Sequence, residues 1–224
     1  MSSGTDNFEY PTGDAQVTSR AGHFDEETAV KTPAMLLLGA LGWEEQAHLQ
    51  NEWLSGTSTE GRSSMRQVIL QPRLLTALQA LNPDLPETAL QKAVDVLIED
   101  RRAMPPQDAA KQFHGLLRSG VKVTMRNDNG GNETQTIRII DWANPRNNHF
   151  FLADEFWVQG EIYKRRLDIV GFVNGIPLLH SELKAPDVSV KHNYDDNLRA
   201  YLTDIPQFFT PNGLVVLSLS LIHI

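Results

Sequence analysis

The 224-residue sequence contains no cysteine, so disulfide bonds and thiolate metal sites are excluded. It also has no apolar run near the roughly 20 residues that a membrane-spanning helix needs. Its first segment, MSSGTDNFEYPTGD, lacks both the basic stretch and the apolar stretch of a secretory signal. Together these absences favour a cytoplasmic protein that has no membrane partner.

Positive charge is scarce as well, because 20 Lys and Arg residues stand against 28 Asp and Glu residues, for a net charge of -8. Bulk positive charge is a main source of affinity for DNA phosphates. Any contact with DNA must therefore be local, or must come mainly from other chains. A GxxxxGK[ST] phosphate loop is missing too, which excludes an ATP-driven motor within this chain.

What is present is an ordinary globular composition, with 41% hydrophobic and 21% charged residues. Residues 1–22 are rich in Ser, Thr, Gly and Asp, and we predict a mobile tail there. Residues 23–120 have mainly helical periodicity, interrupted by an irregular stretch that begins at Trp43. The expected helices cover about 30–41, 72–81, 86–98 and 107–118. The first of them is predicted to bury Val30, Ala34, Leu37, Leu38 and Leu41.

From residue 121 to 224 the pattern changes to the alternation that is typical of strands. We therefore predict an α/β (α+β) fold, in which a mixed central sheet is flanked by helices and preceded by a helical subregion. The expected elements are a hairpin over 121–139, strands over 150–158, 167–173, 176–184 and 214–221, and a helix over 190–203.

Three charged residues stand on two of these apolar strands. Asp168 opens one strand, and Glu182 and Lys184 end the next, where their spacing of two places both on one face. Carboxylates hold Mg²⁺ through one or two ligands, and a nearby cation stabilises the charge that develops during phosphodiester hydrolysis. The carbonyl of Leu183 is a further candidate ligand. A short D…ExK pattern also recurs by chance, and the alternative is a set of solvated strand-end charges with a weak ion pair.

The run FWVQGEIYKRRLDIVGFVNGIPLLHSELKAP, followed by NLRAYLTDIPQFFTPN, resembles the R subunits of type I restriction enzymes. The stretch PRLLTALQALNPDLPETALQKAVDVL is similar to the same family, so that the resemblance covers roughly residues 25–218. It implies a PD-(D/E)xK nuclease fold, which is restriction-endonuclease-like. It matches Asp168, Glu182 and Lys184 to the catalytic carboxylates and lysine. The expected metal ligands are therefore Asp168 and Glu182, together with the Leu183 carbonyl that the strand geometry suggests.

The resemblance also implies a glutamine and a tyrosine, four residues apart, on the following helix. Tyr201 matches the tyrosine, but Asn197 stands in place of the glutamine, which keeps the amide and shortens its reach. His180 stands where the family is usually apolar, and a packed or solvated His is the favoured interpretation. An acidic residue on the first helix can join such a site, for which Glu26 and Glu27 are the candidates.

Basic residues that could meet DNA phosphates are Lys164, Arg165, Arg166, Lys191 and Arg199. The cofactor and partners that the resemblance implies are Mg²⁺, double-stranded DNA, and the modification (methyltransferase) and specificity subunits of the type I complex. ATP is expected to act only through motor domains that are missing from this chain. The alternative function is a catalytically decayed module that links the motor to the partner subunits.

The hairpin between Asp168 and Glu182 poses a geometric problem. A regular hairpin around Asn174-Gly175 pairs Asp168 with Ser181, and Glu182 then points to the other face of the sheet. Both carboxylates can reach one metal ion only if the register slips by one residue. We therefore predict either a three-residue loop with Gly175 left-handed or a bulge near Pro177.

Overall fold

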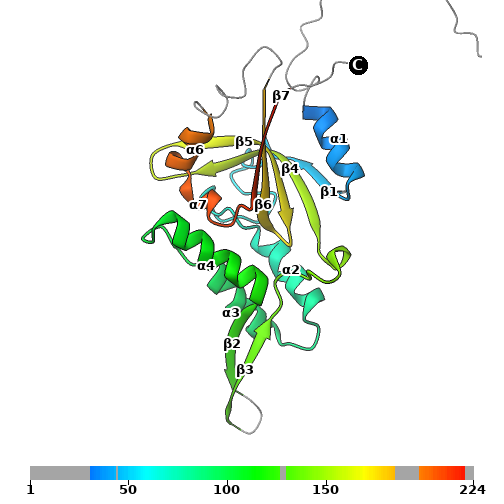
Figure 1. Ribbon diagram of the computed structural model, residues 1–224, viewed down its shortest axis with the longest axis vertical. Helices are drawn as coiled ribbons and strands as arrows, with labels where there is room; N and C mark the ends of the chain where they lie inside the picture. The colour runs from blue at the N-terminus through cyan, green and yellow to red at the C-terminus, as the bar shows by residue number, and fades with distance from the viewer. Residues whose placement is uncertain (1–30, 44, 127–129, 185–196, 220–224) are drawn as a thin grey trace, which may run out of the picture.

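The computed structural model describes residues 31–43, 45–126, 130–184 and 197–219. Its centre is a five-stranded mixed sheet with helices on both faces (Figure 1), which confirms the predicted fold class. The sheet order is β1-β4-β5-β6-β7. Its strands are β1 (Glu45–His48), β4 (Phe150–Gln159), β5 (Lys164–Val173), β6 (Ile176–Lys184) and β7 (Leu214–Leu219).

Strands β4, β5 and β6 form an antiparallel meander, and each edge of the sheet is completed by a parallel strand, β1 beside β4 and β7 beside β6. A parallel pair needs a crossover connection. Between β6 and β7 this connection includes the short helices α6 (Arg199–Asp204) and α7 (Pro206–Phe209). The helix predicted over 190–203 is thus observed in its last part, and residues 185–196 lie outside the described residues.

The predicted helical subregion is confirmed as α2 (Gln71–Leu81), α3 (Glu87–Ile98) and α4 (Pro106–Ser119). Strands β2 (Val121–Arg126) and β3 (Asn132–Ile137) form the predicted hairpin as a separate sheet, which projects below the helices in Figure 1. A 3-10 turn, η2 (Pro145–Asn147), leads into β4. The apolar faces of α2, α3 and α4 join one continuous core with β4 and β5, whose largest fully buried members include Leu74, Leu90, Phe113, Phe156 and Phe172.

The opposite face of the sheet is covered by α1 (Thr32–Ala40). The helix itself was predicted, but part of its expected buried face is wrong, because Leu37 and Leu41 are 62% and 70% exposed. Every side chain around α1 is apolar or small, so periodicity cannot select a face. The contact is made instead by Ala34, Met35 and Leu38 against a small cluster of Leu152, Ile169 and Leu183.

Strand β1 lies in the stretch that the sequence indicated as irregular. Three of its four residues are exposed, so it lacks the alternation that identifies a half-buried strand. Among the described residues, no helix has the length and apolar character needed to cross a membrane.

Candidate active site

The β5–β6 hairpin contains the predicted irregularity. Asn174 and Gly175 form a two-residue turn with φ values of 51° and 77°, as a primed hairpin turn requires. Val173 pairs with Ile176 and Phe172 with Pro177, but the register shifts before Gly171, which pairs with Leu179. Of the two proposed irregularities, the bulge next to Pro177 is therefore confirmed.

The bulge places the two carboxylates opposite each other. Beyond it, Ile169 pairs with Ser181, and the same register puts Asp168 opposite Glu182, on one face of the sheet. Leu178 is the extra residue of the bulge. Its carbonyl oxygen accepts a hydrogen bond from the N–H of Gly213 at 2.9 Å. Proline favours a bulge here because it has no N–H to donate to the ladder.

Asp168 is fixed to the neighbouring strand. Its Oδ2 accepts a hydrogen bond from the backbone N–H of Leu183 at 2.8 Å. The side chain of Leu183 points to the other face, where it is buried against α1. Asp168 is only partly buried, so that its carboxylate can still meet solvent or a ligand.

Glu182 is 1% exposed and is held by the helical segment that follows β6. Asn197 donates through Nδ2 to Glu182 Oε1 at 2.7 Å, and the hydroxyl of Tyr201 donates to the same oxygen at 3.3 Å. Burial, followed by the nearby charges of Glu182 and Asp168, raises the pKa of Tyr201, which keeps its hydroxyl protonated as a donor. The shorter amide of Asn197 thus reaches the carboxylate.

His180 is packed, as the favoured interpretation had it, and it also contacts Glu182. It is fully buried, and its ring lies against Tyr201, Phe208 and Phe209, with centroids 5.7 to 6.4 Å apart. Its Nε2 lies 3.7 Å from Glu182 Oε2. Burial lowers the pKa of His180 to about 4, so the ring is neutral at neutral pH.

Several predicted site residues lie at the limits of the described chain. Lys184 is the last described residue of β6, where its backbone pairs with Leu219 of β7, and the structure does not describe its side chain. Glu26, Glu27 and Lys191 lie outside the described residues.

The basic triplet at the start of β5 is engaged within the protein. Arg165 donates through Nε to Asp204 Oδ2 at 2.7 Å, and Arg166 Nε lies 2.5 Å from Glu155 Oε2. Lys164 Nζ lies 4.5 Å from the centre of the Trp157 ring. Arg199, on α6, is exposed. Two of the three triplet cations therefore have carboxylate partners, and any DNA phosphate has to compete with them.

Glu155 is a residue near the site that the sequence interpretation missed. It is 4% exposed, forms ion pairs with Lys31 and Arg166, and has a φ of 57°, which is costly for a residue with a side chain. The β4–β5 pairs on either side of it bracket Asp168, so the two acids are neighbours across the strands. The available signal was an acidic pair, Asp154-Glu155, inside an apolar strand.

The donor set suits a hard cation with few protein ligands. In the part of the chain that the structure describes, no three His, Asp or Glu side chains converge into a metal cage. Two opposed carboxylates are the smaller set that Mg²⁺ commonly uses, with water and substrate phosphate completing its coordination.

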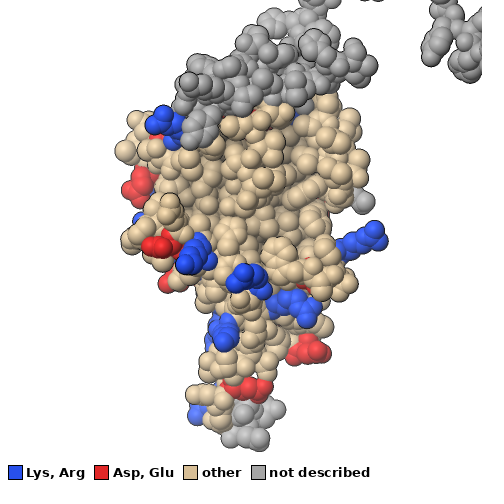
Figure 2. Space-filling view, viewed as in Figure 1, with Lys and Arg blue, Asp and Glu red and all other residues tan. Residues whose placement is uncertain are grey.

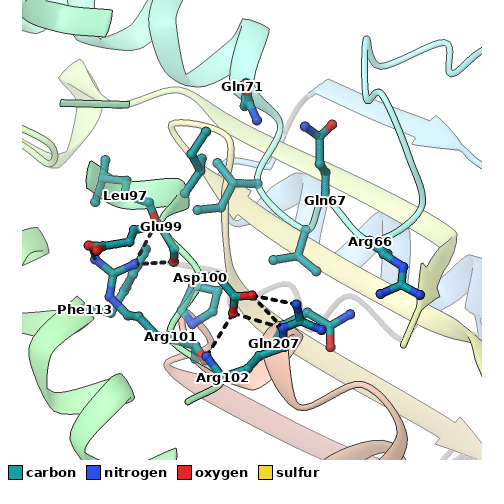
Figure 3. Close-up of a pocket in the computed structure, with 15 residues that line it drawn as sticks. Arg66, Gln67, Gln71, Leu97, Glu99, Asp100, Arg101, Arg102, Phe113 and Gln207 are labelled. Carbon is teal, nitrogen blue, oxygen red and sulfur yellow. Dashed lines mark hydrogen bonds and ion pairs between the residues drawn. The ribbon is translucent and has the colours of Figure 1, made fainter. Parts of the chain in front are cut away.

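A hollow near α7 is a different feature from this site. A cavity of about 250 Å³ lies between the end of α3, α4 and α7, and neither Asp168 nor Glu182 lines it (Figure 3). Arg101 at its wall donates to the carbonyl oxygens of Val96 and Leu97, and Arg102 pairs with Asp100. Because the guanidinium groups of Arg101 and Arg102 already have partners, and neither Asp168 nor Glu182 lines this cavity, it is a poor candidate for the catalytic centre.

The comparisons with known proteins agree on a family. Residues 23–220 match the model of the type I restriction enzyme R protein N terminus. A putative type I restriction enzyme MjaIXP endonuclease subunit from Methanocaldococcus jannaschii is 28% identical over 209 residues, covering 91% of this chain and 19% of that protein. The type I restriction enzyme HindI endonuclease subunit from Haemophilus influenzae is 27% identical over 201 residues, covering 86% of this chain and 18% of that protein.

The chain thus spans about a fifth of the length of these curated relatives. Because the family model matches most of its length, the chain belongs to the family of type I restriction enzyme R proteins, whose N-terminal region it represents.

Proposed function

We propose that this chain is the nuclease part of a type I restriction enzyme and hydrolyses DNA phosphodiester bonds with Mg²⁺. The observation that carries the proposal is the β5–β6 bulge, which brings Asp168 opposite Glu182. A structural hairpin has no need to place two carboxylates face to face, since like charges directly opposite each other destabilise a sheet. A cation bound between the two carboxylates would be attracted by both, and their mutual repulsion would be offset.

In this proposal Asp168, Glu182 and the carbonyl oxygen of Leu183 hold the ion. When bound there, Mg²⁺ would supply the activation of water and the neutralisation of phosphate charge. Asn197 and Tyr201 orient Glu182 through its Oε1. Water attacks phosphorus, and the P–O bond to the leaving sugar oxygen breaks. The ammonium group of Lys184 stabilises the charge on the phosphate oxygens during this step.

The wider assembly belongs to the same proposal. The relatives named as endonuclease subunits are about five times as long as the matched region. We infer that the full-length protein carries ATP-driven motor domains, works in the cytoplasm with modification and specificity subunits, and delivers double-stranded DNA to this site. The contact between Asn197 and Glu182 weighs against a decayed docking module, because the departure from the family residue preserves the support of the carboxylate.

The first test is metal binding by the chain, measured by calorimetric titration with Mn²⁺ in place of Mg²⁺. Asp168→Asn and Glu182→Gln should each abolish the binding, whereas Asp100→Asn, which changes an exposed carboxylate away from the site, should leave it unchanged. Equal binding by all four proteins would overturn the assigned ligands.

The second test is cleavage by the assembled enzyme. Lys184→Ala should reduce the rate about a hundredfold or more, because it removes a charge that acts in the transition state. The thermal unfolding midpoint should hardly change, since a substitution that disrupts neither the core nor a buried pair usually alters stability by less than about 0.5 kcal/mol. Wild-type cleavage by the folded variant would refute the role of Lys184, and an inactive wild-type enzyme would support the docking module.

A further inference from the structure

The turn that joins β4 to β5, residues 160–163, presents two large apolar side chains to solvent. Ile162 is 79% exposed and Tyr163 is 56% exposed, and they are adjacent in the chain. In Figure 1 this turn lies at the end of the β4–β5 hairpin, beside α6. Single exposed apolar residues are common on protein surfaces, but two together at a hairpin tip are a candidate contact surface.

The backbone of the turn is held firmly. The N–H of Gly160 donates to the carbonyl of Tyr163 at 2.8 Å, and Gln159 Nε2 donates to the same carbonyl at 3.3 Å. Gly160 also packs so closely against α6 that a Cβ there would lie 1.8 Å from the carbonyl oxygen of Asp204. Little backbone ordering would therefore be needed when a ligand binds, which favours binding.

The surroundings of the turn carry positive charge and aromatic rings. Lys164 lies over the half-buried ring of Trp157 and has no carboxylate partner among the described residues. The guanidinium of Arg165 lies 5.8 Å from the ring of Tyr163. The acidic residue of the turn, Glu161, lies 2.5 Å from the guanidinium of Arg102, so that its charge is locally compensated.

We propose that this turn is a DNA-contacting wedge, in which Ile162 and Tyr163 enter a groove of the duplex and pack against base edges, while Lys164 meets a backbone phosphate. Proteins that bend DNA insert apolar side chains between base steps in this way, and aromatic rings can stack on exposed bases. The inference rests on the proposed function, because Asp168 follows Lys164 by four residues on β5, a distance of about 13 Å along a strand. That separation lets one duplex meet the carboxylates and the turn together.

The experiment uses the isotopically labelled chain in EDTA, so that no cleavage can occur, and an unlabelled 16-base-pair duplex at low ionic strength. Nuclear magnetic resonance detects complexes with dissociation constants up to the millimolar range. The amides of the turn and the indole N–H of Trp157 should shift on titration. Ile162→Ser combined with Tyr163→Ser should weaken binding at least fivefold, whereas Leu54→Ser, at an 84% exposed position elsewhere, should leave it unchanged.

The outcomes separate this inference from the proposed function. If the turn resonances do not shift, or if the double variant binds as wild type, the wedge is overturned, and a turn that serves a protein partner becomes the better explanation. If the assembled enzyme does not cleave DNA, the proposed function is wrong, but the DNA-binding result for the turn is unaffected. If the assembled enzyme cleaves normally and the turn does not bind DNA, only the wedge is wrong.

Discussion

At the scale of single residues, the site depends on how Glu182 tolerates burial. An ionised carboxylate that is 1% exposed is costly unless hydrogen bonds or charges compensate it. Asn197 and Tyr201 supply two donors to one oxygen, and both come from the segment that follows β6. A carboxylate held in this way has a fixed orientation, which is what a metal ligand needs.

Replacing Asn197 tests this support. We expect Asn197→Ala to weaken Mn²⁺ binding by about tenfold to a hundredfold, the usual effect of losing a group that orients a metal ligand. Asn197→Gln keeps the amide and should retain most of the affinity. Calorimetric titration of both variants beside wild type gives the comparison. Unchanged affinity in Asn197→Ala would mean that Tyr201 alone suffices to hold Glu182.

A second buried charge has a purely structural role. Arg62 and Glu52 form an ion pair whose side chains are fully buried, and Arg62 also donates to the carbonyl oxygens of Gln67 and Trp157. Arg62→Met should lower the free energy of unfolding by about 3–5 kcal/mol, because it leaves Glu52 buried without its partner. The matched control is Arg102→Met, because the Arg102 side chain, which pairs with Asp100, is 42% exposed. This substitution should lower the free energy of unfolding by less than about 1 kcal/mol. Urea unfolding measures both, and similar losses would contradict the argument.

At the scale of secondary-structure elements, the bulge in β5–β6 is packed against the rest of the fold. Gly171 stands beside the register shift, and a Cβ at this position would lie 2.7 Å from the ring of Trp43 and 3.1 Å from Leu179. The Trp43 ring is itself set edge-on against Phe150, with centroids 5.2 Å apart. The glycine thus provides the space in which the irregular strand and this aromatic pair fit together.

Gly171→Ala should destabilise the fold by about 1–3 kcal/mol, as overpacking of a filled core does. Gly115→Ala is the matched control, because this helical glycine has open space around its Cβ position, and the substitution should stabilise by up to about 1 kcal/mol. Chemical denaturation of the two variants gives the difference. A neutral Gly171→Ala would show that Trp43 can move away at no cost.

The elements that sequence patterns predicted are those that bury one regular face. Helices α2, α3 and α4 have that property. For the β5–β6 hairpin, the requirement that Asp168 and Glu182 share a face predicted either a longer loop or a bulge near Pro177, and the bulge is observed. Strand β1 and the segment after it were not predictable, because polar contacts hold them; the Arg62–Glu52 pair is the main example. The strained backbone of Glu155 has no local pattern that could have indicated it.

At the scale of the whole molecule, the net charge determines how strongly the chain can attract a DNA duplex. Lys and Arg residues appear on part of the surface in Figure 2, interspersed with Asp and Glu, and the chain as a whole has a net charge of -8. At the start of β5, Arg165 and Arg166 already contact carboxylates. Long-range attraction to a duplex is therefore weak, and local contacts have to carry any binding.

We therefore expect the chain on its own to cut DNA slowly or not at all, even with Mg²⁺. In the proposed function a motor delivers DNA to the site, so that high local concentration replaces intrinsic affinity. The measurement is incubation of the purified chain with supercoiled plasmid and Mg²⁺ at low and moderate salt, beside a Lys184→Ala control. Rapid nicking that requires Lys184 would show that the domain is self-sufficient, and the dependence on delivery would then be wrong.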